Sequence, residues 1–172
     1  MAAIGAVFAW GLSPLEIKKA LPQLKGVAHR LEFVREFKGV KYYNDTAATI
    51  PDAAISALGS FEKSIVLIAG GSDKNLDFSA FASQICDKAN HLILLKGDAT
   101  NKLLDKIRKC GEESFVNSIE VVDSMESAVL AAKKIAEVNS VVLLSPGAAS
   151  FGLFANEFDR GDKFRDAVKK LK

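Results

Sequence analysis

Hydrophobic residues in the second half of the chain gather in short continuous runs, each followed by a polar or glycine-rich segment and then by a helical pattern. Runs of this kind are typical of strands that are buried on both faces of a parallel sheet. They predict strands over residues 64–69, 91–95, 119–122 and 140–144. The intervening segments predict helices over residues 78–89, 99–110, 124–138 and 158–171.

Two further strands are predicted in the first half of the chain, where the pattern changes. Residues 31–37 alternate apolar and polar side chains, which is typical of a half-buried strand. Gly39 predicts a tight turn, after which residues 40–43 return as a second strand. The alternation of strands and helices predicts an α/β, Rossmann-like fold. We expect a mainly parallel sheet with helices on both faces, preceded by this β-hairpin and a short helical segment.

Helix signals define the short helical segment at the start of the chain. Small apolar residues predict a helix over residues 2–10, and Ser13 followed by Pro14 is a favourable start for a second helix over residues 14–21. A proline also opens a third predicted helix, over residues 51–58. Because the chain begins directly in apolar sequence, we expect the first helices to belong to something larger.

Four polar or glycine-rich segments each follow a predicted strand directly, namely residues 44–49, 70–74, 96–98 and 145–150. Ligands of open α/β sheets bind beyond the carboxyl ends of the strands. We therefore expect these segments to meet at one edge of the sheet. Their glycines let backbone approach a ligand closely, and Lys74 can contact an anion, so an anion-binding site is predicted at that edge.

Each polar segment also has a purely structural explanation. The glycines of residues 70–74 fit an ordinary strand-to-helix turn, and Thr49 and Ser150 can act as helix caps. Taken alone, His29–Arg30 reads as a surface or packing pair, and residues 159–162 (Asp-Arg-Gly-Asp) as a solvated charged face. Six phenylalanines are expected in the core rather than as a cofactor platform: Phe81, Phe115, Phe151, Phe154, Phe158 and Phe164.

Composition narrows the class of protein. A chain of 172 residues with 49% hydrophobic and 26% charged residues is long and apolar enough to bury a core. The net charge of +2 offers no basic field for nucleic acid. Two cysteines without C-x-x-C spacing and two histidines exclude a disulfide framework and a cysteine- or histidine-based metal site. The longest apolar run, residues 2–12, is about half of the roughly 20 residues that a membrane-spanning helix needs.

Motif searches exclude several chemistries. The chain contains no Walker A loop and no G-x-G-x-x-G dinucleotide fingerprint. It also lacks the G-x-S-x-G signature of a serine hydrolase. We expect no membrane partner, no nucleic acid partner and a cytoplasmic location.

Five motifs in a fixed order are more specific than any one of them. They occupy residues 26–33 (GVAHRLEF), 43–49 (YNDTAAT), 70–74 (GGSDK), 144–151 (LSPGAASF) and 158–164 (FDRGDKF). Together they closely resemble the carboxyl-terminal part of the Mur ligase family, and the Asn-Asp-Thr-x-Ala-Thr segment resembles its D-glutamate-adding branch. The resemblance covers nearly the whole chain.

The resemblance implies a domain organisation and an activity. Residues 1–25 would be the tail of a central ATPase domain, and residues 26–172 an amino-acid-binding domain. The implied bacterial enzyme is an ATP-dependent, amide-forming ligase of peptidoglycan precursor synthesis. ATP phosphorylates the carboxylate of UDP-N-acetylmuramoyl-L-alanine, and the amine of D-glutamate displaces phosphate from the acyl phosphate. Phosphorylation supplies a leaving group, while positive charge and Mg²⁺ stabilise the developing negative charge.

The family's phosphate loop and Mg²⁺ ligands would lie in the missing central domain, and its UDP-binding domain is missing too. No catalytic residue or metal ligand is therefore expected in this chain, and the fragment alone is expected to be inactive. By motif match, Arg30 and Asp45 resemble the family's ATP contacts, to phosphate and ribose respectively. Four residues resemble its D-glutamate contacts: Thr49, Lys74, Ser150 and Phe151.

Two positions depart from the family pattern. Ala47 stands where the family often has a lysine, which removes one cation. Glu157 falls where many relatives place an aromatic residue, and Phe158 can take that role after a one-residue shift. Two alternatives stay open: a Rossmann-like binding or regulatory module without catalysis, and a folylpolyglutamate synthase-type ligase domain.

Overall fold

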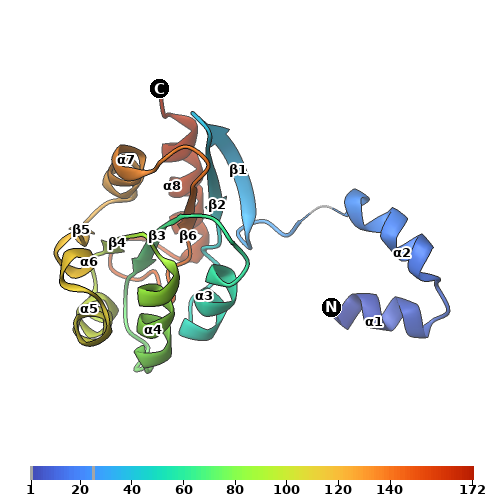
Figure 1. The fold of residues 1–172 in the computed structure, drawn as a ribbon, viewed down its shortest axis with the longest axis horizontal. Helices are drawn as coiled ribbons and strands as arrows, with labels where there is room; N and C mark the ends of the chain where they lie inside the picture. The colour runs from blue at the N-terminus through green and yellow to red at the C-terminus, as the bar shows by residue number, and fades with distance from the viewer. Residues whose placement is uncertain (1, 25) are drawn as a thin grey trace.

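Six strands form one sheet in the order β1-β2-β6-β3-β4-β5. The computed structural model describes residues 2–24 and 26–172. The strands are β1 (Glu32–Phe37), β2 (Val40–Asn44), β3 (Ile65–Gly70), β4 (His91–Leu95), β5 (Glu120–Val122) and β6 (Val141–Leu144). Only the β1–β2 hairpin pairs antiparallel, and every other neighbouring pair is parallel. The predicted Rossmann-like architecture is confirmed (Figure 1).

The helices occupy nearly the predicted segments, with ends shifted by a few residues. They are α1 (Ala2–Ala9), α2 (Pro14–Ala20), the 3₁₀ helix η1 (Leu21–Gln23), α3 (Pro51–Leu58), α4 (Ser79–Lys88), α5 (Asp98–Cys110), α6 (Glu113–Asn117), α7 (Met125–Ile135) and α8 (Glu157–Lys169). Helix α6 was not predicted. It has only five residues and buries none of them, so the pattern of apolar residues carries no signal for it.

Two hydrophobic cores explain why the central strands are continuously apolar. Alternate residues of β3 point to opposite faces of the sheet. Ile65 and Leu67 pack in the core beneath α3, α4 and α5, whereas Val66 and Ile68 pack in the core beneath α7 and α8. Strands β4 and β6 divide their residues in the same way. Helices on both faces therefore leave no solvent-facing side for a polar residue.

Helices α1 and α2 form a hairpin that lies apart from the sheet in Figure 1. Ser13 caps α2 as predicted, because its hydroxyl accepts from the Glu16 amide at 3.3 Å and the Glu16 carboxylate accepts from the Ser13 amide at 2.9 Å. Large apolar side chains stay exposed on the hairpin, including Trp10 at 88%. Lys25, where the predicted domain boundary falls, lies outside the described residues. In the described ranges no helix has the length and apolar character needed to span a membrane.

Two residues that could act as helix caps, Thr49 and Ser150, do not cap a helix in the structure. Helix α3 begins after Ile50 with no side-chain cap, so Thr49 does not cap it. Helix α8 is capped by Asn156, whose side chain accepts from Asp159. Ser150 lies too far before α8 to take that part. Ser124 caps α7 through its side chain, which accepts from the Ser127 amide at 3.2 Å. Thr49 and Ser150 are thus free of the structural role that competed with a ligand-binding role.

Candidate functional site

The four polar segments meet at the carboxyl edge of the parallel strands, as predicted. Backbone hydrogen bonds of 2.8 to 3.0 Å join the segments, from Asp45 to Leu144, Gly147 to Ala48, Ser72 to Ala149 and Ala99 to Gly71. The loops therefore follow one another in the order of the strands that they extend. This arrangement is a direct consequence of parallel pairing, which brings the carboxyl ends of β2, β6, β3 and β4 to one edge.

Asp45 is the buried carboxylate of this edge and is only 4% exposed. Its Oδ1 accepts from the Leu31 amide at 3.0 Å, and its Oδ2 accepts from the Ser145 hydroxyl at 2.8 Å. Burial raises the pKa of Asp45 above its ordinary value, while the two hydrogen bonds and the charge of Arg30 act in the opposite direction. Each carboxylate oxygen keeps acceptor capacity for one more donor, such as a ligand hydroxyl.

A cavity of about 290 Å³ opens beside Asp45. Its lining combines two charged residues with mostly small residues of the loop and α3: Arg30, Leu31, Asp45, Ala47, Ala48, Ala53, Ser56, Ala57 and Ser60. Arg30 is exposed and carries the positive charge at this cavity. A ligand with an anionic group and a hydroxyl group could be held between the guanidinium and the carboxylate.

The other predicted residues lie on three adjacent loops at the same edge. Thr49 is half-buried and Ser150 is buried. The loop that carries Ser150 is joined to the β3 loop by the Ser72–Ala149 bridge and by a hydrogen bond from the Ser72 hydroxyl to the Phe151 carbonyl. Lys74 lies two residues beyond Ser72 and is exposed.

Lys74 forms no ion pair with any residue that the structure describes. The Phe151 side chain is 61% exposed and that of Phe158 is 56% exposed, so the expectation that both lie in the core is wrong. Phe81 and Phe164 are fully buried, as predicted. Two aromatic faces and a free ammonium group are thus open to a ligand near this edge.

Arg160 is a further residue whose surroundings differ from the prediction. It was read as part of a solvated face, but it is fully buried in the structure. Its Nε donates to the Thr46 hydroxyl at 2.9 Å, and its two terminal nitrogens donate to the carbonyls of Thr46 and Ala148 at 3.0 and 3.1 Å. Burial lowers the pKa of Arg160 to about 10, so the group stays charged at neutral pH. The guanidinium ties the β2 loop to the β6 loop.

A signal for Arg160 was present in the sequence. The buried residues of α8 and the turn that follows it include Phe164, Ala167, Val168 and Leu171. Arg160 precedes Phe164 by four positions and Ala167 by seven, so it lies on the same helical stripe. A charged residue on an apolar stripe is buried only where donors or acceptors satisfy it, and the two loops supply three acceptors.

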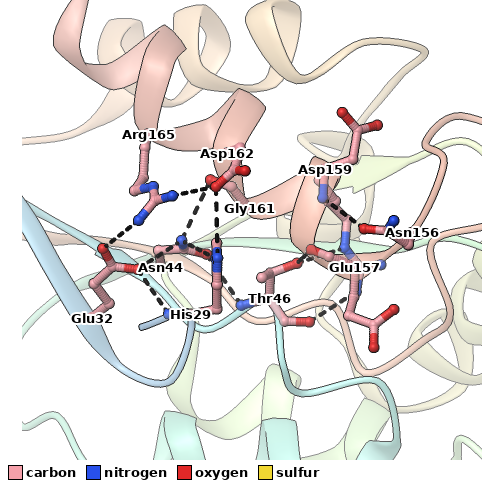
Figure 2. Close-up of polar contacts among 11 residues, drawn as sticks. His29, Glu32, Asn44, Thr46, Asn156, Glu157, Asp159, Gly161, Asp162 and Arg165 are labelled. Carbon is pink, nitrogen blue, oxygen red and sulfur yellow. Dashed lines mark hydrogen bonds and ion pairs between the residues drawn. The ribbon is translucent and has the colours of Figure 1, made fainter. Parts of the chain in front are cut away.

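A polar cluster links the start of β1, the end of β2 and α8 (Figure 2). The Asn44 amide nitrogen lies 3.1 Å from His29 Nδ1 and 3.1 Å from Glu32 Oε2. Arg165 donates to Glu32 at 3.1 Å and also to Asp162. Burial raises the pKa of Glu32, but the His29 amide and Arg165 outweigh burial and hold it below the ordinary value. His29 is 8% exposed, so it is the buried member of the His29–Arg30 pair, whereas Arg30 is exposed.

The two departures noted in the sequence take different places. Ala47 lines the cavity beside Asp45, and its amide donates to the His29 carbonyl at 3.0 Å. Glu157 is half-buried and its carbonyl accepts from the Thr46 hydroxyl at 2.9 Å. Phe158 packs edge-on against His29, with ring centroids 5.6 Å apart. Of Glu157 and Phe158, only Phe158 offers an aromatic ring, and that ring is exposed to solvent.

The predicted residues form no metal site in the part of the chain that the structure describes, and a second cavity lies away from them. Within residues 2–24 and 26–172, no three His, Cys, Asp or Glu side chains are grouped so that they could hold a metal ion. The described residues therefore do not supply a set of ligands for Mg²⁺. A cavity of about 510 Å³ lies between residues 75–78 and α5 and contains none of the predicted site residues.

Parallel strands with polar loops at their carboxyl ends, and a cavity between a cation and a buried carboxylate, define a Rossmann-like ligand-binding domain. Residues 29–147 match the family described as Mur ligase, glutamate ligase domain, and the chain belongs to this family. The family expected from the five sequence motifs is therefore confirmed.

Similar proteins bear this out. The chain is 48% identical to UDP-N-acetylmuramoylalanine–D-glutamate ligase from Roseiflexus sp. (strain RS-1), over 99% of this chain and 36% of that protein. It is 43% identical to the enzyme of the same name from Caldicellulosiruptor saccharolyticus, over 99% of this chain and 37% of that protein. The chain thus spans about a third of the length of these relatives.

Solved structures share the fold at low identity. E. coli FolC in complex with ADP has a TM-score of 0.63 at 19% identity, over 98% of this chain and 39% of that chain. The MurF ligase from Thermotoga maritima in complex with ADP has a TM-score of 0.53 at 18% identity, over 86% of this chain and 33% of that chain. These likenesses support the fold assignment.

Proposed function

We propose that this chain is the carboxyl-terminal part of an ATP-dependent ligase that adds D-glutamate to UDP-N-acetylmuramoyl-L-alanine in the bacterial cytoplasm. Family membership and the name of the relatives support this assignment. In this reaction the substrate carboxylate becomes an acyl phosphate at the expense of ATP, and the amine of D-glutamate then displaces phosphate. This domain has to hold the amino acid so that its amine faces the acyl carbon.

The observation that carries the proposal is the cavity shared by Arg30 and Asp45. A nucleotide has the two groups that this cavity suits, namely phosphate oxygens for a guanidinium and ribose hydroxyls for a carboxylate. Asp45 is held in place by Leu31 and Ser145, so it needs no reorganisation when a hydroxyl arrives. The small side chains of α3 leave room for the rest of the ligand.

The adjacent loops suit a small dicarboxylic amino acid. Lys74 has no ion pair among the described residues, so its ammonium can pair with a substrate carboxylate. Thr49 and Ser150 do not cap helices, and their hydroxyls are available to hydrogen-bond the same substrate. The exposed ring of Phe151 can cover it. Ala47 contributes no charge, so Lys74 carries the positive charge that this proposal assigns to D-glutamate.

The remaining two thirds of the enzyme would supply what this chain lacks. Residues 1–25 would be the end of a central ATPase domain, and the exposed apolar side chains of α1 and α2 would pack against it. Mg²⁺ would be held mainly by that domain, because the described residues here offer no cluster of ligands for it. The UDP-containing substrate would likewise be bound upstream.

A phosphate-release assay tests whether this chain needs the rest of the enzyme for turnover. The 172-residue chain, supplied with ATP, Mg²⁺, D-glutamate and UDP-N-acetylmuramoyl-L-alanine, should release no phosphate above background, whereas the enzyme encoded by the complete reading frame should turn over. Sustained turnover by the 172-residue chain would contradict the proposal. Replacing D-glutamate by L-glutamate should abolish turnover, and a preference for the L form would favour the folylpolyglutamate-type alternative.

Lys74→Ala tests the amino-acid site in the complete enzyme. A hydrogen bond to a charged group contributes about 1.5–3 kcal/mol, so the KM for D-glutamate should rise about tenfold or more. Lys96→Ala is the matched control, because Lys96 follows β4 at the same edge but resembles no ligand contact. The control should change that KM less than about twofold. Equal effects of the two substitutions would remove Lys74 from the site.

A further inference from the structure

A strained turn presents Arg30 to the cavity. The residues on both sides of Arg30 have left-handed backbone conformations, with φ of 64° at His29 and 43° at Leu31. For residues other than glycine such conformations are unfavourable by about 1 kcal/mol or more each, and they persist only where surrounding contacts hold them. The contacts around this turn therefore decide where the Arg30 side chain is placed.

His29 is held from several sides (Figure 2). Its amide donates to Glu32 Oε2 at 2.8 Å, and its carbonyl accepts from the Ala47 amide at 3.0 Å. Its ring lies 3.1 Å from the Asn44 side chain through Nδ1 and 3.6 Å from Asp162 through Nε2. The helix α8 backbone is packed so close to the ring that a methyl group at Gly161 would collide with Nδ1. On the far side of the turn, Asp45 holds the Leu31 amide at 3.0 Å.

The contacts of Asn44 relate its amide nitrogen to one ring nitrogen of His29. Its Oδ1 accepts from the Thr46 amide at 3.2 Å, so Nδ2 is the donor end of the side chain. The same Nδ2 faces His29 Nδ1. Glu32 Oε2 at 3.1 Å and the Gly161 carbonyl at 3.4 Å are the other acceptors within reach of this Nδ2, which has two hydrogens. A hydrogen bond from Nδ2 to His29 requires Nδ1 to be unprotonated, and the neutral ring then has its proton on Nε2, on the side of Asp162.

We propose that His29 is a positioning residue for Arg30. The Nδ1 acceptor, engaged by Asn44, holds the left-handed turn and so directs the guanidinium into the nucleotide cavity. The proposal rests on the proposed function in one respect, the nucleotide as the occupant of that cavity. The tautomer of His29 and the geometry of the turn do not depend on it.

Three substitutions of His29 in the complete enzyme separate this role from simple packing. Asparagine accepts positive φ better than most residues and keeps an acceptor oxygen at the δ position. Glutamine places its polar end one atom further out. His29→Ala and His29→Gln should raise the KM for ATP about tenfold, and His29→Asn should restore it to within about threefold. The KM for D-glutamate should stay within twofold in all three. Failure of asparagine to outperform glutamine would overturn the proposal.

A double-mutant cycle shows whether His29 acts through Arg30. Arg30→Ala should raise the KM for ATP, and adding His29→Ala to it should change that KM less than about twofold. Independent, multiplying effects would mean that His29 acts elsewhere. If Arg30→Ala leaves the KM for ATP unchanged, the nucleotide assignment itself is wrong, and His29 has no such target.

Nitrogen NMR of the 172-residue chain supplies a readout that needs no activity. Long-range proton–nitrogen correlations should show that Nε2 of His29 is protonated and Nδ1 is unprotonated. Asn44→Ala removes the donor and should shift the Nδ1 resonance of His29, whereas Asn101→Ala, a surface asparagine on α5, should not. A proton on Nδ1 in the unmodified chain would overturn the positioning proposal whatever the kinetics show.

Discussion

Replacing Arg160 by methionine should lower the free energy of unfolding by about 3 kcal/mol. Methionine roughly preserves the volume of the side chain, so the loss reports polar contacts more than an empty cavity. Three acceptors lose their donor, namely the hydroxyl and carbonyl of Thr46 and the carbonyl of Ala148. Each buried acceptor left without a donor is unfavourable by about 1–3 kcal/mol, and removal of a desolvated charge offsets part of the sum.

Urea denaturation of the 172-residue chain, followed by circular dichroism, measures this change. Arg108→Met is the matched control, because Arg108 lies on α5 with its side chain 58% exposed in a surface pair with Asp105. Such pairs contribute about 0–1 kcal/mol, so the control should stay within about 1 kcal/mol of the unmodified chain. If both variants lose the same stability, Arg160 does not bridge the loops.

Gly71→Ala should destabilise the chain by about 3 kcal/mol and disorganise the ligand-binding edge. Gly71 has φ of 135°, a region that residues with side chains rarely adopt. A methyl group there would press against the Ala149 carbonyl oxygen, a backbone atom that cannot rotate away. The neighbouring Ser72–Ala149 bridge joins the two loops. Overpacking and backbone strain act together at this position, each unfavourable by about 1–3 kcal/mol.

Gly59→Ala provides the comparison for this substitution. Gly59 follows α3 with φ of −66°, and a methyl group would meet backbone oxygens only at 3.6 and 3.7 Å. The free energy of unfolding of the Gly59→Ala variant should differ from that of the unmodified chain by less than about 1 kcal/mol. Amide NMR spectra should show shifts spread over residues 145–151 for Gly71→Ala and only local shifts for Gly59→Ala. A Gly71→Ala variant as stable as the control would mean that the loops can separate without loss.

The location of the candidate site could be predicted from the sequence, but the contacts that hold its loops in place could not. Residues 44–49, 70–74 and 145–150 were identified because each follows a strand, and parallel strands end at one edge. Arg160 was misplaced because its partners Thr46 and Ala148 come from other loops, Thr46 lying 114 positions away along the chain. The apolar stripe of α8 indicates that Arg160 is buried, but the sequence around Arg160 does not identify the residues that it contacts.

The roles of Thr49 and Ser150 also depended on tertiary structure. Both residue types are good caps, and local sequence favoured that role for each. The structure starts α3 after Ile50 and caps α8 with Asn156, which leaves the two hydroxyls at the sheet edge. The residue at which the helix begins determines which side chain can cap it. That first residue depends on how the preceding loop packs against its neighbours.

Sequence alone determined the strands, the longer helices and the sheet edge at which the polar segments meet, because periodicity and strand ends are local properties that parallel topology converts into position. Tertiary structure alone decided which two loops bind Arg160, that His29 is enclosed by Asn44 and α8, and that Arg30 and Asp45 share one cavity. These features depend on contacts between segments more than ten positions apart. Such contacts form only once the hydrophobic faces of the sheet and helices have packed together.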